Sequence, residues 1–488
     1  MRVRETLLFR SSEREKFLPI YLIFPFFIQF LFIMLMVNYT QITTLYIINV
    51  FVTIIYSFLY IFYFKTPIYL LYHLILIIIS QNLLIGLGNV FSENQTSGQN
   101  LKLALVYKEV FAIIFVLFLF IKFKNNLRLF RFEKIFLGIV LIVLLSFFVS
   151  SATLDAKAYY IRVFLILFVS YAIGRLLFFG FRNKAIDLEN VYSIVVKSGV
   201  IVAVIGFLFM MIGNDSPIWS EWFNFGIIQE AKRGVFESHP DFMTQLGALI
   251  LPRMFSIFFD PISLGYFLAT ALLCTWLRKR NNPITQWILA AALLCTLVKG
   301  AIGVVLITYV WIIALKFLKL KPRNIIILFI SVIIISFIIL FNIDIKSSSD
   351  VHMAGLIEPI LNSHNIPFGM GLGNGGNYYA IQSGISAWFV THTGAESFFG
   401  VLLYQLGYPG VLLFLGFFIG AVVTMLKYST EHSGELRGKY IIASGILFSL
   451  LIASLLQEST FGINFSGILL IIIGIYFSRI QNESENSV

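Results

Sequence analysis

Arg253 is the first residue whose surroundings suggest chemistry. It precedes the turn Asp260-Pro261, and an apolar run of membrane-spanning length follows at once. Asp260 is a favourable helix N-cap and Pro261 suits a first helical turn, so Arg253 should lie close to the outer membrane surface. A guanidinium there can bind phosphate oxygens through paired hydrogen bonds, or it can serve only as an interfacial anchor.

Residues 367–376 form a glycine-rich segment, PFGMGLGNGG. Gly369, Gly371 and Gly373 would let the backbone turn tightly and approach a ligand, and Asn374 adds a polar side chain. A phosphate-cradling loop is one interpretation, but no Lys-Ser/Thr pair follows the segment and no strand precedes it. Composition alone therefore favours a flexible outer loop.

Glu396 opens an apolar helix and is the candidate proton acceptor. The helix dipole stabilises a carboxylate at this position by about 0.3–1 kcal/mol, which suits either a base or a capping residue. His392 lies one helical turn earlier and could pair with Glu396 or replace it as the base. The helix is expected to pause at residues 407–410, GYPG, before it crosses the membrane.

The elements that must position these residues are apolar helices. The chain has 488 residues, of which 59% are hydrophobic and 12% charged. Apolar runs of about 20 residues, the length that crosses a bilayer, recur along it. This pattern indicates an all-α polytopic membrane protein with about 12–14 transmembrane helices and two larger extracytoplasmic loops.

The predicted spans, about 14 in all, are residues 17–37, 44–64, 67–90, 103–121, 135–152, 158–180, 191–213, 261–277, 284–298, 301–318, 324–342, 397–426, 440–457 and 461–478. Lys299-Gly300-Ala301 should separate two short helices that meet near the outer face. A single long helix would place the basic residues at 316–323 outside, against the positive-inside rule.

Positive charge is distributed as that rule expects if both termini are cytoplasmic. The formal net charge is +11, and its dense clusters, near residues 2–16, 122–134, 278–280 and 316–323, fall on the cytoplasmic side. The excess of basic residues therefore reflects the membrane topology and contact with anionic membrane lipids. It argues against nucleic-acid binding.

This topology divides the chain into six parts. They are a scaffold of about seven helices (1–213), an extracytoplasmic loop (214–260), transmembrane helices (261–342), a large extracytoplasmic loop (343–395), C-terminal transmembrane helices (396–479) and a cytoplasmic tail (480–488) that is expected to be disordered. No cluster of His, Cys and Asp has metal-ligand spacing, so no metal or cofactor is expected.

Arg162 lies one turn inside the outer end of its span. An ionisable side chain in hydrocarbon usually faces a partner or a wet cavity. Arg162 could therefore point into an outer cavity, or it could form an ion pair with a neighbouring helix.

Together the three segments resemble the O-antigen polymerase and O-antigen ligase (Wzy-type) superfamily of bacterial membrane glycosyltransferases. Its members typically show an arginine, a Pro-containing turn and a Gly before a span, as at Arg253, Pro261 and Gly265. They also show a GxGxGN stretch late in a large outer loop, as at residues 369–374. The motifs cover about residues 230–425, and the hydropathy layout covers the whole chain.

Two departures from the family pattern bear on function. Ligases usually carry His where this chain has Glu396, which favours the polymerase branch. The family often has Ser-Arg-Gly where this chain has Val298-Lys299-Gly300, so Lys299 keeps the charge but loses the forked geometry of arginine. Within the family the chain looks most like the Gram-positive teichuronic-acid polymerase.

The resemblance implies a reaction in the cytoplasmic membrane of a bacterium. A polyprenyl-diphosphate-linked oligosaccharide would be transferred to a sugar hydroxyl of another lipid-linked repeat unit. Because diphosphate leaves, cationic side chains can stabilise its charge without a metal: Arg253 first, then Arg233 and Lys299. Glu396 would accept the hydroxyl proton, with His392 as the alternative.

The same resemblance makes Gly369, Gly371, Gly373 and Asn374 candidates for substrate contact, and Arg162 is a further candidate from its place inside a span. A separate chain-length regulator could dock on the protein. Two other functions stay open. A ligase of the same superfamily would attach finished polymer to another acceptor. A flippase or transporter of lipid-linked oligosaccharide would usually have short loops and two similar halves, which this chain does not show.

Overall fold

The computed structural model describes residues 42–90, 98–233, 239–246, 249–280, 282–317, 348–383 and 390–486, with single positions at 27, 31, 237, 324 and 327. Within this part of the chain, ten helices are long and apolar enough to cross a membrane, and two shorter apolar helices join them. The protein is therefore an all-α polytopic membrane protein, as predicted.

Each predicted span in the described part of the chain overlaps one of these apolar helices. Their bounds are α3 (Ile42–Phe58), α4 (Ile68–Val90), α5 (Gly98–Phe123), α6 (Ile135–Val149), α7 (Leu154–Leu177), α8 (Lys184–Ile212), α11 (Pro261–Leu277), α12 (Pro283–Cys295), α13 (Lys299–Ile312), α17 (Phe398–Glu431), α18 (Gly434–Leu456) and α19 (Ile468–Asn486). The predicted spans 17–37 and 324–342 lie outside the described residues.

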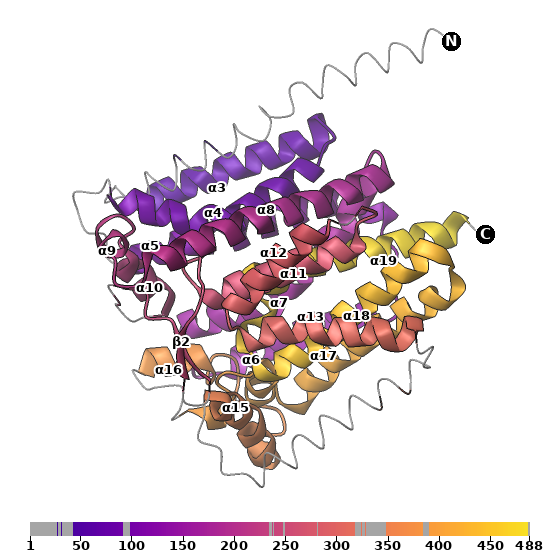
Figure 1. The fold of residues 1–488 in the computed structure, drawn as a ribbon. Coiled ribbons are helices and arrows are strands. Elements are labelled where there is room, and N and C mark those ends of the chain that lie inside the picture. The colour runs from indigo at the N-terminus through magenta and orange to yellow at the C-terminus, as the bar shows by residue number, and fades with distance from the viewer. Residues whose placement is uncertain are drawn as a thin grey trace.

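The short elements gather at one end of the helical bundle. Figure 1 shows them along the left and lower left of the molecule, whereas the C-terminus lies at the opposite end. They are α9 (Ile218–Glu221), α10 (Phe225–Arg233), α15 (Ser348–Asn362) and α16 (Asn377–Ser383), with the hairpin described below. We call this end, which carries the described parts of residues 213–260 and 348–397, the loop end.

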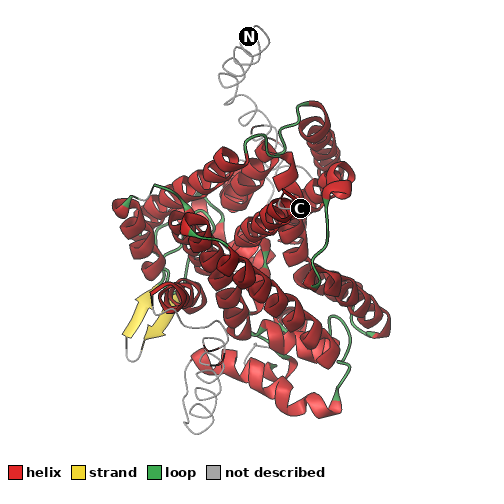
Figure 2. Cartoon of the chain, turned by 90° about the vertical axis from the view of Figure 1, so that its right-hand side faces the viewer, coloured by secondary structure: helices red, strands yellow, loops and turns green. Residues whose placement is uncertain are grey.

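A two-stranded hairpin at the loop end is the feature of the described residues that departs from the all-α prediction. Strand β1 (Met243–Leu246) pairs antiparallel with β2 (Leu249–Pro252), and Met243 lies opposite Pro252. Figure 2 shows the hairpin in yellow at the edge of the bundle. The two segments become strands by pairing with each other. Met-Thr-Gln-Leu and Leu-Ile-Leu-Pro are too short to show a clear period of two in the sequence.

Two predicted interruptions are confirmed. Helix α12 ends at Cys295 and α13 begins at Lys299, and Leu297 between them has a left-handed backbone (φ 52°). Helix α17 is broken at Gly407, where φ is 67° and ψ is −167°. The prediction of a disordered tail is wrong for residues 480–486, because α19 continues to Asn486.

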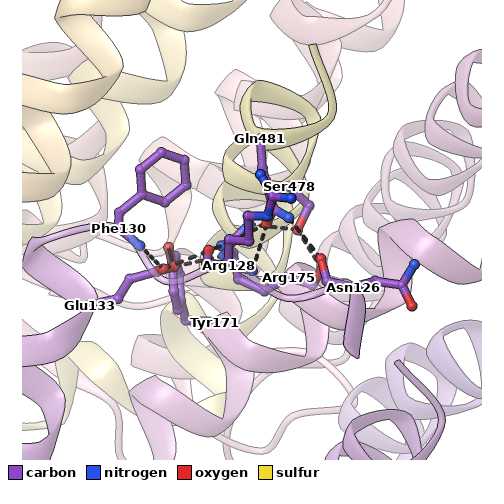
Figure 3. A network of polar contacts seen from close by, with 8 residues as sticks. All are labelled: Asn126, Arg128, Phe130, Glu133, Tyr171, Arg175, Ser478 and Gln481. Carbon is purple, nitrogen blue, oxygen red and sulfur yellow. Dashed lines mark hydrogen bonds and ion pairs between the residues drawn. The ribbon is translucent and has the colours of Figure 1, made fainter. Parts of the chain in front are cut away.

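A buried ion pair closes the other end of the bundle. Arg175 of α7 lies 2.7 Å from Glu133, and their side chains are only 2% and 5% exposed. The guanidinium also donates to Ser478 and to the Arg128 carbonyl, as Figure 3 shows. These charge-assisted bonds tie the connection between α5 and α6 to α7 and α19.

Candidate functional site

The hairpin and the α12–α13 break hold Arg253 at the loop end. Its backbone N–H donates to the Phe242 carbonyl (2.8 Å), which continues the strand pairing. Its Nε donates to the carbonyl of Thr296 (3.1 Å), inside the break. The side chain is half-buried. Asp260 caps α11 by accepting from the N–H of Ser263 (2.9 Å), so the predicted N-cap is confirmed.

Lys299 begins α13 and is exposed. The break before it packs closely on α11, because a Cβ added to Gly265 would lie 2.9 Å from the Val298 side chain and 3.1 Å from Thr296 Oγ1. Arg253 and Lys299 thus flank one tight turn. We call these two residues the cationic cluster.

Glu396 lies in the turn before α17, with an uncommon left-handed backbone (φ 70°). Its Oε2 is 3.3 Å from Nδ1 of His352 in α15, and the two side chains are 26% and 32% exposed. Glu396 is not the helix cap, since Ser397 accepts the N–H of Gly400 (3.0 Å) in that role. The predicted capping role of Glu396 is therefore taken by Ser397, and its predicted role as a proton acceptor stays a prediction.

His392 does not occupy the predicted position one helical turn before Glu396. It lies exposed in a short 3₁₀ turn, Thr391–Thr393, and Gly394 then reverses the backbone in a left-handed conformation. The histidine that the structure brings to Glu396 is His352, which is 44 residues away in sequence. Spacing along the chain could not reveal this pair, because it depends on how α15 packs against the turn.

Glu458 is a second carboxylate that the sequence analysis missed. It lies in the turn between α18 and α19 and is only 4% exposed. The Tyr160 hydroxyl donates to its Oε1 (2.9 Å) and the Asn377 N–H to its Oε2 (2.9 Å). The signal in the sequence was an ionisable residue placed directly after an apolar span.

Burial is the main reason that the pKa of Glu458 is raised from its ordinary value of 4.5 to about 7, and the nearby charge of Glu396 contributes to the rise. The hydrogen bonds from the Asn377 N–H and from Tyr160, and the nearby Glu396 N–H, act in the opposite direction, because they stabilise the charged form. Glu396, Glu458 and His352 are called the carboxyl cluster below.

The cationic and carboxyl clusters are joined through α11. The hydroxyl of Tyr266 lies 3.4 Å from Oγ1 of Thr460, two residues beyond Glu458. The same hydroxyl faces the α12–α13 break, since a Cβ on Gly300 would lie 2.7 Å from it. The start of α13 and the turn that carries Glu458 therefore both lie against Tyr266.

Arg162 belongs to the surroundings of the carboxyl cluster. Its guanidinium carbon lies 4.8 Å from the centre of the Tyr159 ring, which stacks on Tyr378 at 4.4 Å. A cation over an aromatic face is a favourable arrangement, so Arg162 is held without an acidic partner among the described residues. Arg233 ends α10, and its side chain lies outside the described part of the structure.

The glycine-rich segment packs against α17 instead of forming an open cradle. The N–H groups of Gly371 and Gly373 donate to Gln405, to its carbonyl (3.1 Å) and its side-chain oxygen (2.9 Å) respectively. The Gly369 N–H donates to the Ile366 carbonyl (2.9 Å). Phosphate binding needs unpaired N–H groups, and these are already engaged.

The side-chain amide of Asn374 is also used within the protein. It donates to the Met370 carbonyl (2.6 Å) and to Ser150 Oγ (3.2 Å). These backbone and amide groups are therefore bonded within the protein, and contact of this segment with substrate stays a prediction. The structure assigns a packing role to Gly369, Gly371, Gly373 and Asn374.

The arrangement can stabilise a departing anion with the cationic cluster and move a proton with the carboxyl cluster. Among the described residues, no group of three or more His, Cys, Asp and Glu side chains could hold a metal ion. No family model matches the chain, and no curated protein matches it.

Proposed function

We propose that this protein is a polymerase of a bacterial cell-surface polysaccharide, of the O-antigen polymerase (Wzy) type. The observation that supports the proposal is that both clusters lie at the loop end, where Tyr266 of α11 contacts Thr460, two residues beyond Glu458. A glycosyl transfer from a diphosphate needs these two functions side by side: cations for the leaving group and a base for the acceptor.

In the proposed reaction, the bond between the anomeric carbon and the diphosphate oxygen breaks, and the acceptor sugar hydroxyl forms the new glycosidic bond. Arg253 and Lys299 stabilise the charge that develops on the diphosphate. Glu396 takes the hydroxyl proton, and His352 at 3.3 Å holds the carboxylate in place. Arg162 is the further candidate for contact with the glycan.

The substrate of this reaction is a polyprenyl-diphosphate-linked oligosaccharide, and the polymer class is that of teichuronic acid, O-antigen, capsule or exopolysaccharide. The loop end then faces the outside of a bacterial cytoplasmic membrane, with both termini in the cytoplasm. The charge distribution supports this orientation, because the basic clusters at 122–134 and 278–280 fall at the ends of helices α5 and α11 that lie opposite.

Lipid-linked intermediates from a deletion strain test the proposal. Loss of a polymerase should leave single repeat units on the outer leaflet, and complementation with the wild-type gene should restore long glycans. Arg253→Ala should fail to restore them while the protein still inserts. Arg280→Ala is the matched control, because Arg280 is exposed just beyond the opposite end of α11 and should restore normal glycans.

Two outcomes would overturn the proposal. Single units on the inner leaflet would indicate a flippase. Normal polymer lengths left on the lipid carrier would indicate a ligase.

A further inference from the structure

Glu458 lies among three separate parts of the loop end. Its carboxylate accepts the Tyr160 hydroxyl of α7 and the N–H of Asn377, the first residue of α16, each at 2.9 Å. The backbone N–H of Glu396 also lies near enough to lower the pKa of this carboxyl group. One buried side chain thereby ties a membrane helix to the end of the glycine-rich segment, beside the turn that carries the proposed base.

The Glu396 backbone needs such support. Its φ of 70° is left-handed, a conformation that costs a non-glycine residue about 1–2 kcal/mol. Strained conformations of this kind persist where the surrounding structure fixes them, and they cluster at functional sites. The Ser397 cap, which bonds the Gly400 N–H and the Leu455 carbonyl, fixes the turn on one side, and the Glu458 carboxylate lies near the Glu396 N–H on the other.

We propose that Glu458 is a positioning residue for Glu396, and that the site is active only when Glu458 is ionised. This inference rests on the proposed function. An ionised carboxylate accepts both hydrogen bonds and also attracts the nearby Glu396 N–H. A protonated carboxyl group carries no charge to attract that N–H, and its own proton then competes with the Tyr160 and Asn377 donors.

The ionisable and charged groups around Glu458 determine how its charge depends on pH. Tyr159 and Tyr160 face it from α7, Glu396 faces it from the turn before α17, and Arg162 lies next to Tyr159. With its pKa at about 7, Glu458 changes charge within the physiological range. Activity should therefore fall as the pH drops below neutral.

Two measurements on the full-length protein in lipid vesicles test this inference. Infrared spectroscopy follows the carboxylic-acid band of Glu458 with pH, identified by its loss in Glu458→Gln. The Glu396→Gln change should lower the Glu458 pKa, because it removes a like charge. The Tyr160→Phe change should raise it by about one unit, because it removes a hydrogen bond to the charged form.

The second measurement is the pH dependence of polymerisation. Wild type should show an inflection near pH 7 that moves upward in Tyr160→Phe and is absent in Glu458→Gln, whose turnover should fall by up to about 100-fold. Glu358→Gln is the control: this half-buried carboxylate accepts the Thr391 hydroxyl at the same end and should leave the inflection in place.

An unchanged pH profile in Glu458→Gln, or a carboxylic-acid band that titrates near 4.5, would overturn the inference. If wild type and all variants fail to polymerise, the proposed function fails. The infrared titration then still shows whether Glu458 and Glu396 interact. A Glu458 pKa that stays constant in Glu396→Gln would refute that interaction.

Discussion

Gly371→Ala distinguishes a packing segment from a ligand cradle. Gly371 has a φ of +86°, and an added Cβ would lie 2.8 Å from Cα and 2.9 Å from Cβ of Ser150. The left-handed backbone costs about 1–2 kcal/mol for alanine, and overpacking adds about 1–3 kcal/mol. We therefore expect the free energy of unfolding to fall by about 2–5 kcal/mol.

The assay is equilibrium unfolding of the purified protein in detergent, followed by tryptophan fluorescence. Gly303→Ala is the matched control, because Gly303 lies inside α13 and an added Cβ would meet nothing within 4 Å. It should stabilise the protein by up to about 1 kcal/mol, through the higher helix propensity of alanine. A Gly371→Ala protein with wild-type stability and no polymerisation would refute the packing role and restore the cradle.

Three further outcomes follow from the same contacts. Arg175→Met should lower the free energy of unfolding by about 3–5 kcal/mol, because it leaves Glu133 buried without its cation; an equally stable variant would show that the pair is dispensable. His352→Ala should change stability by less than about 1 kcal/mol, since the contact is partly exposed, and should slow polymerisation. Between pH 4.5 and 7 the folded protein binds more protons at Glu458 than the unfolded chain does, so the free energy of unfolding should fall by about 3 kcal/mol as the pH rises through this range. Glu458→Gln should abolish this dependence when unfolding is measured at several pH values.

The helices were predictable because each carries its own signal. Apolar length fixes a span wherever it occurs, and the interruptions at Lys299 and Gly407 follow from local backbone chemistry. The hairpin β1–β2 was not predictable, because its strands are defined by pairing with each other. The helices and their order along the chain were therefore predictable from the sequence.

The site was predictable only in part. Arg253 and Glu396 were found from their places beside turns and spans. The partners of Glu396 were not, because His352 and Glu458 reach it through the packing of α15 and of the α18–α19 turn. The packing of the glycine-rich segment was not predictable either, since glycines that permit close approach to a ligand also permit close approach to α17.

Polymerisation by the purified protein tests the central claim most directly. The protein is placed in vesicles with a defined lipid-linked repeat unit and a chelator, and the glycans are sized by gel electrophoresis. Wild type should build a ladder of repeat units and release polyprenyl diphosphate, whereas Arg253→Ala and Glu396→Gln should leave single units. A ladder of wild-type length from either variant, or single units left unchanged by the wild-type protein, would contradict the account.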